Sequence, residues 1–235
     1  MKALPTVCIL AGGLATRLGD RARSTPKALT DVAGEPFLFR QLRLIASYGA
    51  QDVVLCVGHL GEMVERQVGS KRFGLDIRYS FDSPGLDGTL GAIRNARPLL
   101  RDRFLVLYGD TYLRVDYRAF ADSWIHSGLD AGMTVLHNQN RWDRSNVLYS
   151  DGRVVRYDKG VEDPEMEWID YGLGALRTDV LDLVGVDEPD LAALYRELAR
   201  RSQLFGFEAT ERFFEIGTPE ALTETSAFFM ANEGD

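Results

Sequence analysis

The sequence has few of the cysteines and histidines that form disulfide bonds and structural metal sites in small folds. Its 235 residues include two cysteines, Cys8 and Cys56, and three histidines. Both cysteines lie inside apolar stretches, where a thiol behaves as a small buried hydrophobe. No cysteine or histidine spacing is typical of a zinc site. The composition therefore argues against a disulfide framework and a structural zinc, and we expect a reducing, cytoplasmic location.

Long apolar runs and an excess of basic residues are also missing. No stretch reaches the roughly 18 consecutive apolar residues that a membrane-spanning helix needs. The segment Met1 to Thr6 leads into an apolar run without a cleavage site, so we expect no signal peptide. The formal net charge is −8, whereas nonspecific binding to nucleic acid or anionic lipid favours basic surfaces. We therefore expect neither as a partner, although a small anionic substrate stays open.

The first half of the chain alternates between strand-like and helix-like patterns. Apolar runs predict buried strands at residues 6–10, 53–57 and 104–107, and residues 76–79 are a further strand candidate. Helical periodicity predicts helices from Pro36 to about residue 48, and at 62–68, 89–96 and 117–127. Strands that alternate with helices form right-handed βαβ units in a mostly parallel sheet. Together with the length, this pattern predicts one α/β domain.

After about residue 130 the pattern changes. Strand candidates follow closely at 133–136, 147–149, 154–157 and 169–176, and Asp151-Gly152 is a hairpin signal between two of them. Helical patterns return at 178–184, 190–201 and 219–232. The predicted fold is a Rossmann-like three-layer α/β/α sandwich with a mostly parallel, mixed central sheet and a more irregular second half. We expect residues 1–235 to form a single domain.

A glycine-rich segment follows the first predicted strand and reads Leu10-Ala11-Gly12-Gly13-Leu14-Ala15-Thr16-Arg17-Leu18. Adjacent glycines let backbone N–H groups approach a phosphate closely, and an arginine fork suits phosphate oxygens. Ligands of open parallel sheets bind at this edge, beyond the carboxyl ends of the strands. The glycines alone are also compatible with a tight turn, and the segment is neither a Walker loop nor a dinucleotide fingerprint.

The run from Leu10 to Leu29, which includes Pro26-Lys27, resembles the signature of the sugar nucleotidyltransferases. In that family the glycine loop wraps the nucleotide phosphates, and an arginine and a lysine neutralise them. The resemblance therefore assigns nucleotide binding to a set of loop residues: Leu10, Ala11, Gly12, Gly13, Thr16, Arg17 and Lys27. Ala15 stands where the family usually has a third glycine.

Later segments extend the resemblance over nearly the whole chain. Asp87-Gly88-Thr89 resembles the segment that lies against the nucleotide base, and Gly109-Asp110 resembles the one that carries Mg²⁺. From the residues alone, Thr89 is also compatible with an ordinary helix cap, and a strand-end aspartate is often a turn residue. The resemblance implies that Arg17, Lys27 and Asp110 are catalytic.

Three segments of the second half resemble the acceptor side of the family. Lys159 matches the lysine that contacts the phosphate of the sugar 1-phosphate, and Asp170 and Gly172 match the strand that lines the sugar pocket. Glu215 stands where the family has an aspartate that supplies a second metal carboxylate. The resemblance thus implies a nucleotide-binding half at about 1–130 and a sugar-phosphate-binding half at about 131–235.

The implied reaction is Mg²⁺-dependent transfer of a nucleotidyl group from an NTP to a sugar 1-phosphate, with release of pyrophosphate. The pattern is most similar to compact guanylyltransferases that act on manno-configured sugars, such as those supplying GDP-heptose for polysaccharide biosynthesis. Homodimers and higher homo-oligomers are common in that family.

Three alternatives stay open. The first is uridylyl, thymidylyl or cytidylyl transfer to another sugar 1-phosphate or to phosphocholine. The second is a metal-dependent glycosyltransferase, which shares the strand-end aspartate but has no need for the Pro-Lys segment. The third is a catalytically silent, nucleotide-binding regulatory subunit, since Ala15 and Glu215 depart from the family pattern.

Overall fold

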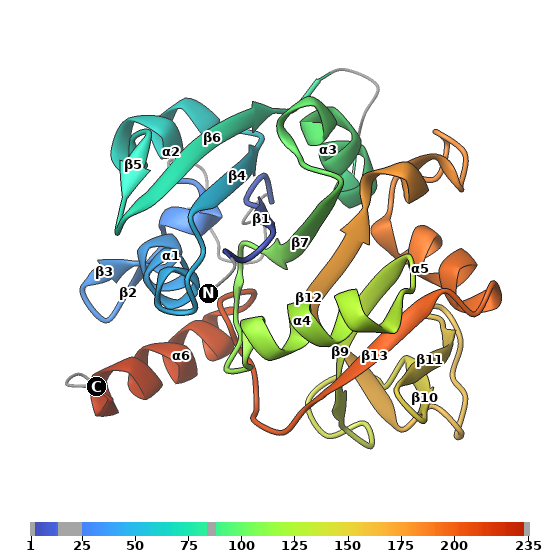
Figure 1. Ribbon diagram of the computed structural model, residues 1–235. Helices are drawn as coiled ribbons and strands as arrows, with labels where there is room; N and C mark the ends of the chain where they lie inside the picture. The colour runs from blue at the N-terminus through green and yellow to red at the C-terminus, as the bar shows by residue number, and fades with distance from the viewer. Residues whose placement is uncertain (1–2, 14–24, 84–87, 233–235) are drawn as a thin grey trace.

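The computed structural model describes residues 3–13, 25–83 and 88–232. Its α-helices are α1 (Phe37–Ser47), α2 (Gly61–Val68), α3 (Gly88–Ala96), α4 (Tyr117–Ser127), α5 (Leu191–Arg200) and α6 (Pro219–Ala231). Short 3₁₀ helices are η2 (Lys27–Leu29), η3 (Arg97–Leu99) and η4 (Thr178–Asp182). These elements surround a large central sheet, and α6 extends away from the body of the molecule (Figure 1).

The central sheet contains strands from both halves of the chain. Its strands are β1 (Thr6–Leu10), β4 (Asp52–Val57), β5 (Lys71–Arg72), β6 (Leu75–Phe81), β7 (Arg103–Tyr108), β9 (Ala131–His137), β10 (Val147–Ser150), β11 (Arg153–Tyr157), β12 (Trp168–Arg177) and β13 (Leu204–Ala209). Their spatial order is β10-β11-β13-β9-β12-β7-β1-β4-β6-β5. Two small pairs join β2 (Asp31–Val32) to β3 (Glu35–Pro36) and β8 (Thr111–Tyr112) to β14 (Phe214–Glu215).

The sheet is mixed, with a parallel half and an antiparallel insertion. β1 runs parallel to β4 and β7, and β4 runs parallel to β6. β12 pairs antiparallel with both β7 and β9, so it connects the two halves. The predicted Rossmann-like α/β class with a mostly parallel, mixed sheet is confirmed, and the strands after residue 130 continue the same sheet.

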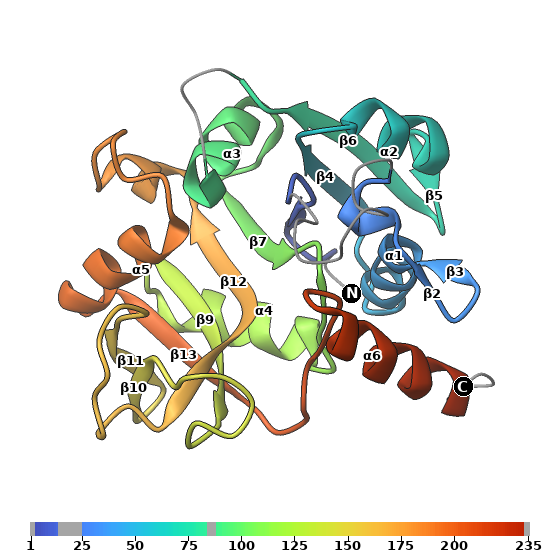
Figure 2. The ribbon, with the colours of Figure 1, turned by 180° about the vertical axis from the view of Figure 1, so that it is seen from behind.

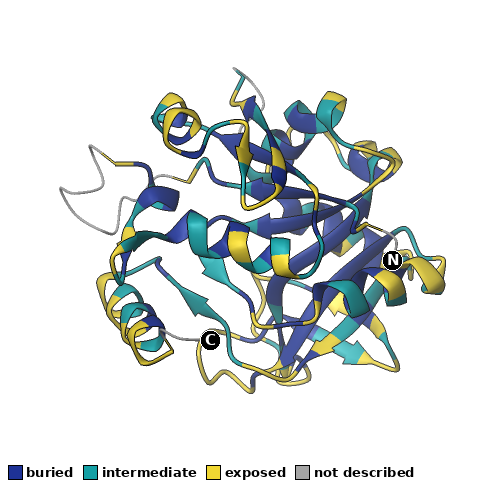
Figure 3. Ribbon diagram, turned by 60° about the vertical axis from the view of Figure 1, so that its left-hand side comes forward, coloured by how far each residue is buried: buried dark blue, intermediate teal, exposed yellow. Residues whose placement is uncertain are grey.

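Helices cover both faces of the sheet because successive strand residues point to opposite sides. In β1, Val7 and Ile9 pack in one apolar cluster with residues of α1, α2 and α4. Cys8, between them, packs in a second cluster with residues of α3 and α5. Figure 3 shows the buried strands enclosed by partly exposed helices. The three-layer arrangement follows directly from this alternation.

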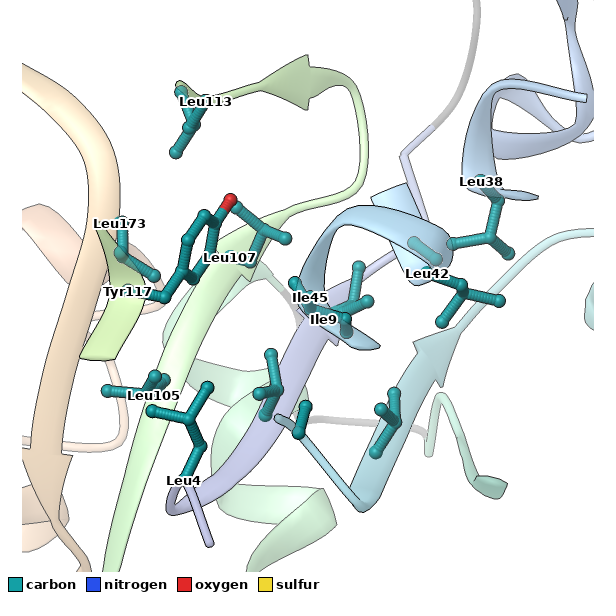
Figure 4. Packing of buried hydrophobic residues seen from close by; sticks show 14 of the residues in the cluster. Leu4, Ile9, Leu38, Leu42, Ile45, Leu105, Leu107, Leu113, Tyr117 and Leu173 are labelled. Atoms are coloured by element: carbon teal, nitrogen blue, oxygen red, sulfur yellow. The ribbon is translucent and has the colours of Figure 1, made fainter. Parts of the chain in front are cut away.

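Helix α1 shows how the sequence pattern produces the packing. Leu38, Leu42 and Ile45 recur at helical spacing, and all are fully buried. Figure 4 shows Ile45 close to Ile9 of β1, with Leu105 and Leu107 on the neighbouring strand β7. The helix begins directly after Pro36, which is the N-cap residue and has extended backbone with ψ 131. The predicted apolar face is confirmed.

Other local predictions were partly wrong. The hairpin at Asp151-Gly152 is confirmed, and both turn residues have positive φ. The pattern at 178–184 forms only the short 3₁₀ helix η4. Strand β13 was not predicted, yet it runs parallel to β9 over its full length. Its Gly206 lowers strand propensity but is needed there, because a Cβ would lie 2.5 Å from the Tyr149 ring.

Gly174 in β12 has no room for a side chain, so replacing it should lower the stability of the fold. A Cβ there would lie 1.9 Å from the hydroxyl oxygen of Tyr195, which is buried in α5. Gly174→Ala should therefore destabilise the fold by about 1–3 kcal/mol, the usual cost of overpacking. Adding Tyr195→Phe should recover part of the loss. A Gly174→Ala variant whose midpoint of denaturant unfolding equals that of the wild type would contradict this packing.

Candidate functional site

A cavity of about 320 Å³ opens where several parallel strands end. In an open α/β sheet this edge is the usual place for a ligand. Figure 2 shows the side of the molecule on which α1 and α3 flank β1 and β7. The cavity brings together eight of the predicted nucleotide-site residues and Asp110 with five others. The lining residues are Leu10, Ala11, Gly12, Gly13, Lys27, Ala28, Cys56, Asp82, Gly88, Thr89, Ala92, Tyr108, Gly109 and Asp110.

The glycines at this edge of the sheet differ in how much room they leave for a side chain. Gly109 donates its N–H to the Leu10 carbonyl at 3.0 Å, and a Cβ at 109 would lie 2.7 Å from that oxygen. A Cβ at Gly12 would lie 3.1 Å from the Gly58 nitrogen, whereas one at Gly13 would meet no described atom within 4 Å. Close packing thus requires a glycine at 109 and leaves little room for a side chain at 12, whereas Gly13 leaves open space beside the cavity.

Lys27 and Asp110 meet at the cavity although 83 positions separate them in sequence. The Lys27 Nζ donates to Asp110 Oδ2 at 2.6 Å, and the two side chains are 16% and 34% exposed. Lys27 opens the 3₁₀ turn η2, whose Ala28 and Leu29 are buried and fix the turn against the core. Asp110 is the second residue after the end of β7. The site therefore combines a cation and a carboxylate at one sheet edge.

Gln41 was missed by sequence reasoning, and it supports the turn that carries Asp110. Its side-chain amide donates to the carbonyls of Tyr108 at 2.8 Å and Thr111 at 2.6 Å. Gln41 is 1% exposed on the buried face of α1. A single amide inside an apolar helix face was the available signal. The two hydrogen bonds couple α1 to the position of the Asp110 turn.

The backbone of Glu215 lies beside the turn that carries Asp110, but Glu215 does not line the cavity. It pairs with Thr111 through β14 and β8, and the following Ile216 N–H donates to the Asp110 carbonyl at 3.0 Å. Carboxylate oxygens suit a hard divalent cation. Within residues 3–13, 25–83 and 88–232, no group of three or more Asp, Glu, His or Cys side chains could hold a metal.

The start of α3 is fixed by the start of α5. The Thr89 hydroxyl donates to Asp190 at 3.2 Å and accepts the Leu191 N–H at 2.8 Å. A Cβ at Gly88 would lie 2.5 Å from the Pro189 carbonyl, so this close approach needs a glycine. The cavity wall made by Gly88 and Thr89 is therefore held in place by the second half of the chain.

Lys159 does not line the cavity, but it lies close to a residue that does. Its Nζ is 5.8 Å from the ring centre of Tyr108, which itself lines the cavity, and 3.9 Å from Asp170 Oδ2. Burial raises the pKa of Tyr108 well above its ordinary value, and the Asp170 charge adds to this effect. Tyr108 is therefore neutral at ordinary pH. Gly172 has φ +108, where the pairing of β12 with β9 shifts register.

Three of the predicted nucleotide-site residues, Thr16, Arg17 and Asp87, lie outside the described residues. Cys8 and Cys56 are buried free thiols whose sulfurs are 3.4 Å apart, as expected for small core residues. No helix within the described ranges has both the length and the hydropathy to span a bilayer.

Comparison with known proteins points to one class of enzyme. Mannose-1-phosphate guanyltransferase beta-B of Xenopus laevis is 29% identical over 231 residues, which cover 94% of this chain and 62% of that protein. The chain thus spans less than two thirds of that relative. D-glycero-alpha-D-manno-heptose 1-phosphate guanylyltransferase of Aneurinibacillus thermoaerophilus is 27% identical over 219 residues, covering 90% of this chain and 93% of the relative.

A solved structure supports the same fold. HddC from Yersinia pseudotuberculosis, complexed with GMP-PN, matches with a TM-score of 0.76 and 25% identity, covering 96% of this chain and 100% of that chain. The model of the MobA-like NTP transferase domain matches residues 7–152. Since this match takes in more than half of the chain, together with Lys27 and Asp110, the chain belongs to the family of MobA-like NTP transferase domains, which are nucleotidyltransferases.

Proposed function

We propose that the chain transfers a guanylyl group from GTP to a manno-configured heptose or hexose 1-phosphate, giving the GDP-sugar and pyrophosphate. The observation that carries this proposal is the Lys27–Asp110 pair beside the glycine-lined cavity. A lysine suits the triphosphate, and a neighbouring carboxylate suits its metal ion. The guanylyltransferases among the relatives support the choice of base and sugar.

The chemistry needs positioning more than proton transfer. The sugar phosphate oxygen attacks the α-phosphorus in line with the leaving pyrophosphate, and it is already an anion. Neither a general base nor a covalent enzyme intermediate is required. The protein must bring two mutually repelling anions together and stabilise the charge on the transferred phosphoryl group and the leaving group.

The nucleotide is assigned to the first half of the chain, at about 1–130. Backbone N–H groups near Gly12 and Gly13 face the phosphates, with Leu10, Ala11, Thr16 and Gly109 completing this set. Arg17 and Lys27 neutralise the triphosphate, and Lys27 exchanges its contact with Asp110 for one with phosphate. The base lies against Gly88 and Thr89, on the wall that α5 holds in place, and the resemblance adds Asp87 to this set.

Mg²⁺ is the proposed cofactor, held by Asp110 and assisted by Glu215. Bound there, it would supply positive charge to the phosphate oxygens. The adjacency of the two backbones, through the Ile216 N–H and the Asp110 carbonyl, supports this pair. The acceptor is assigned to the second half, at about 131–235, where Lys159 binds its phosphate and Gly172 lines the sugar pocket. The cytoplasmic location and the homo-oligomeric state stay predictions.

The function is tested by pyrophosphate release from four NTPs against a panel of sugar 1-phosphates and phosphocholine, with and without Mg²⁺. We expect the highest kcat/KM with GTP and a manno-configured acceptor, and no turnover after chelation of divalent cations. A preference for UTP, dTTP or CTP would replace the guanylyl assignment by one of the alternatives. Tight NTP binding without release on any acceptor would indicate a silent regulatory subunit and overturn the proposal.

The Lys27–Asp110 pair gives a sharper test of the site. Asp110→Ala and Lys27→Ala should each lower turnover by about a hundredfold or more, as loss of a charge-stabilising group often does. The matched control is Lys71→Ala and Asp76→Ala, since these residues form an exposed Lys–Asp pair at 3.1 Å on β5 and β6. The control variants should keep wild-type turnover. Near-normal pyrophosphate release by either site variant would contradict the assignment.

A further inference from the structure

The Asp170 carboxylate is almost fully enclosed by protein. Its side chain is 6% exposed. Oδ1 accepts the Gly172 N–H at 3.1 Å, and Oδ2 accepts the Tyr157 hydroxyl at 3.1 Å. Both carboxylate oxygens therefore have internal donors. A sugar hydroxyl would have to compete with these donors for a group that has little surface to offer.

Lys159 differs from Asp170 in exposure while remaining next to it. Its side chain is 44% exposed, and its Nζ lies 3.9 Å from Asp170 Oδ2. The same Nζ lies near two aromatic rings, 5.8 Å from the centre of Tyr108 and 5.9 Å from that of Tyr157. The ammonium group therefore has a buried carboxylate and two aromatic rings as neighbours. Such surroundings favour one orientation of an otherwise flexible side chain.

The backbone beneath Lys159 is tied to the strand that carries Asp170. The side-chain oxygen of Asn146 accepts the Asp170 N–H at 2.9 Å, and its backbone carbonyl accepts the Asp158 N–H at 3.0 Å. Asn146 is 8% exposed, so these hydrogen bonds are shielded from water. The guanidinium of Arg144 also donates to the Lys159 carbonyl. The lysine is thus held at both its backbone and its side chain.

Tyr157, which donates to the Asp170 carboxylate, is itself fixed in the core. It is 1% exposed, and its ring packs edge-on against Tyr195 with centroids 5.9 Å apart. Burial raises the pKa of Tyr157 well above its ordinary value, and the Asp170 charge adds to this effect. The phenol therefore remains a hydrogen-bond donor at ordinary pH and continues to orient the carboxylate.

We propose that Asp170 is a positioning residue, which with Tyr157 and Asn146 orients Lys159 toward the acceptor phosphate, and that it is not a ligand of the sugar hydroxyls. The assignment rests on the proposed function, because it takes the phosphate of a sugar 1-phosphate as the group that Lys159 binds. It replaces the sugar-pocket contact expected for Asp170 from the sequence.

The test is a double-mutant cycle between Asp170→Asn and Lys159→Met, with KM measured separately for acceptor and NTP. Asp170→Asn alone should raise the acceptor KM about tenfold, the size of coupling expected within one hydrogen-bonded network. The KM for the NTP should stay at the wild-type value. In the Lys159→Met background, Asp170→Asn should have little further effect. Asp122→Asn, an exposed aspartate on α4, is the control and should change neither constant.

A panel of acceptors separates positioning from hydroxyl binding. If Asp170 only orients Lys159, Asp170→Asn raises KM by the same factor for mannose 1-phosphate and for its deoxy analogues. A factor that disappears for one deoxy sugar, or an effect that adds fully to that of Lys159→Met, would overturn the proposal. Thermal unfolding of each variant reports folding, and Tyr157→Phe, which removes only one donor to Asp170, carries the same test if Asp170→Asn does not fold.

The outcome for the proposed function is read separately. A wild-type chain with no turnover on any acceptor overturns the function, and with it this role of Asp170. Normal wild-type turnover combined with additive effects of Asp170→Asn and Lys159→Met overturns only the role of Asp170.

Discussion

The attraction between Lys27 and Asp110 is the interaction on which the site depends. A lysine and an aspartate 2.6 Å apart neutralise each other while the cavity holds no anion. Under the proposed function, a triphosphate competes for the lysine and a divalent cation competes for the carboxylate, so the two ligands relieve each other's electrostatic cost. The Gln41 hydrogen bonds to the Asp110 turn keep this pair at the sheet edge. The charges are thereby placed before any ligand arrives.

Much of the fold followed from periodicity, because burial on two faces leaves a strong pattern. Residues 7–10 are all apolar, and alternate residues pack into two separate cores. Strand β13 was not predicted because its sequence is suited to a neighbour far away in the chain. Gly206 weakens the strand pattern, but a side chain there would clash with the Tyr149 ring. The pattern at 178–184 likewise did not reveal that only one 3₁₀ segment forms. Such features depend on tertiary contacts that local propensity does not encode.

The site was predictable where a motif carried it and hidden where only packing did. Lys27 and Asp110 were expected at one site from their motifs, and the turn η2 and the end of β7 bring them into contact. Gln41 and Tyr157 looked like ordinary members of buried faces, because their function lies in hydrogen bonds to distant backbone and side-chain atoms. Asp170 was assigned to the sugar by resemblance, while its surroundings point inward to Tyr157 and Gly172. Motifs identify reactive groups, and contacts identify what orients them.

Calorimetric binding of GTP to the wild type and to Asp110→Ala, with and without Mg²⁺ and in the absence of acceptor, tests the central claim most directly. Without Mg²⁺, Asp110→Ala should bind GTP more tightly than the wild type, because Lys27 is released and a negative charge is removed. With Mg²⁺ the order should reverse, since the carboxylate that holds the cation is gone. An Asp110→Ala variant that binds GTP more weakly than the wild type by the same factor in both conditions would contradict the account.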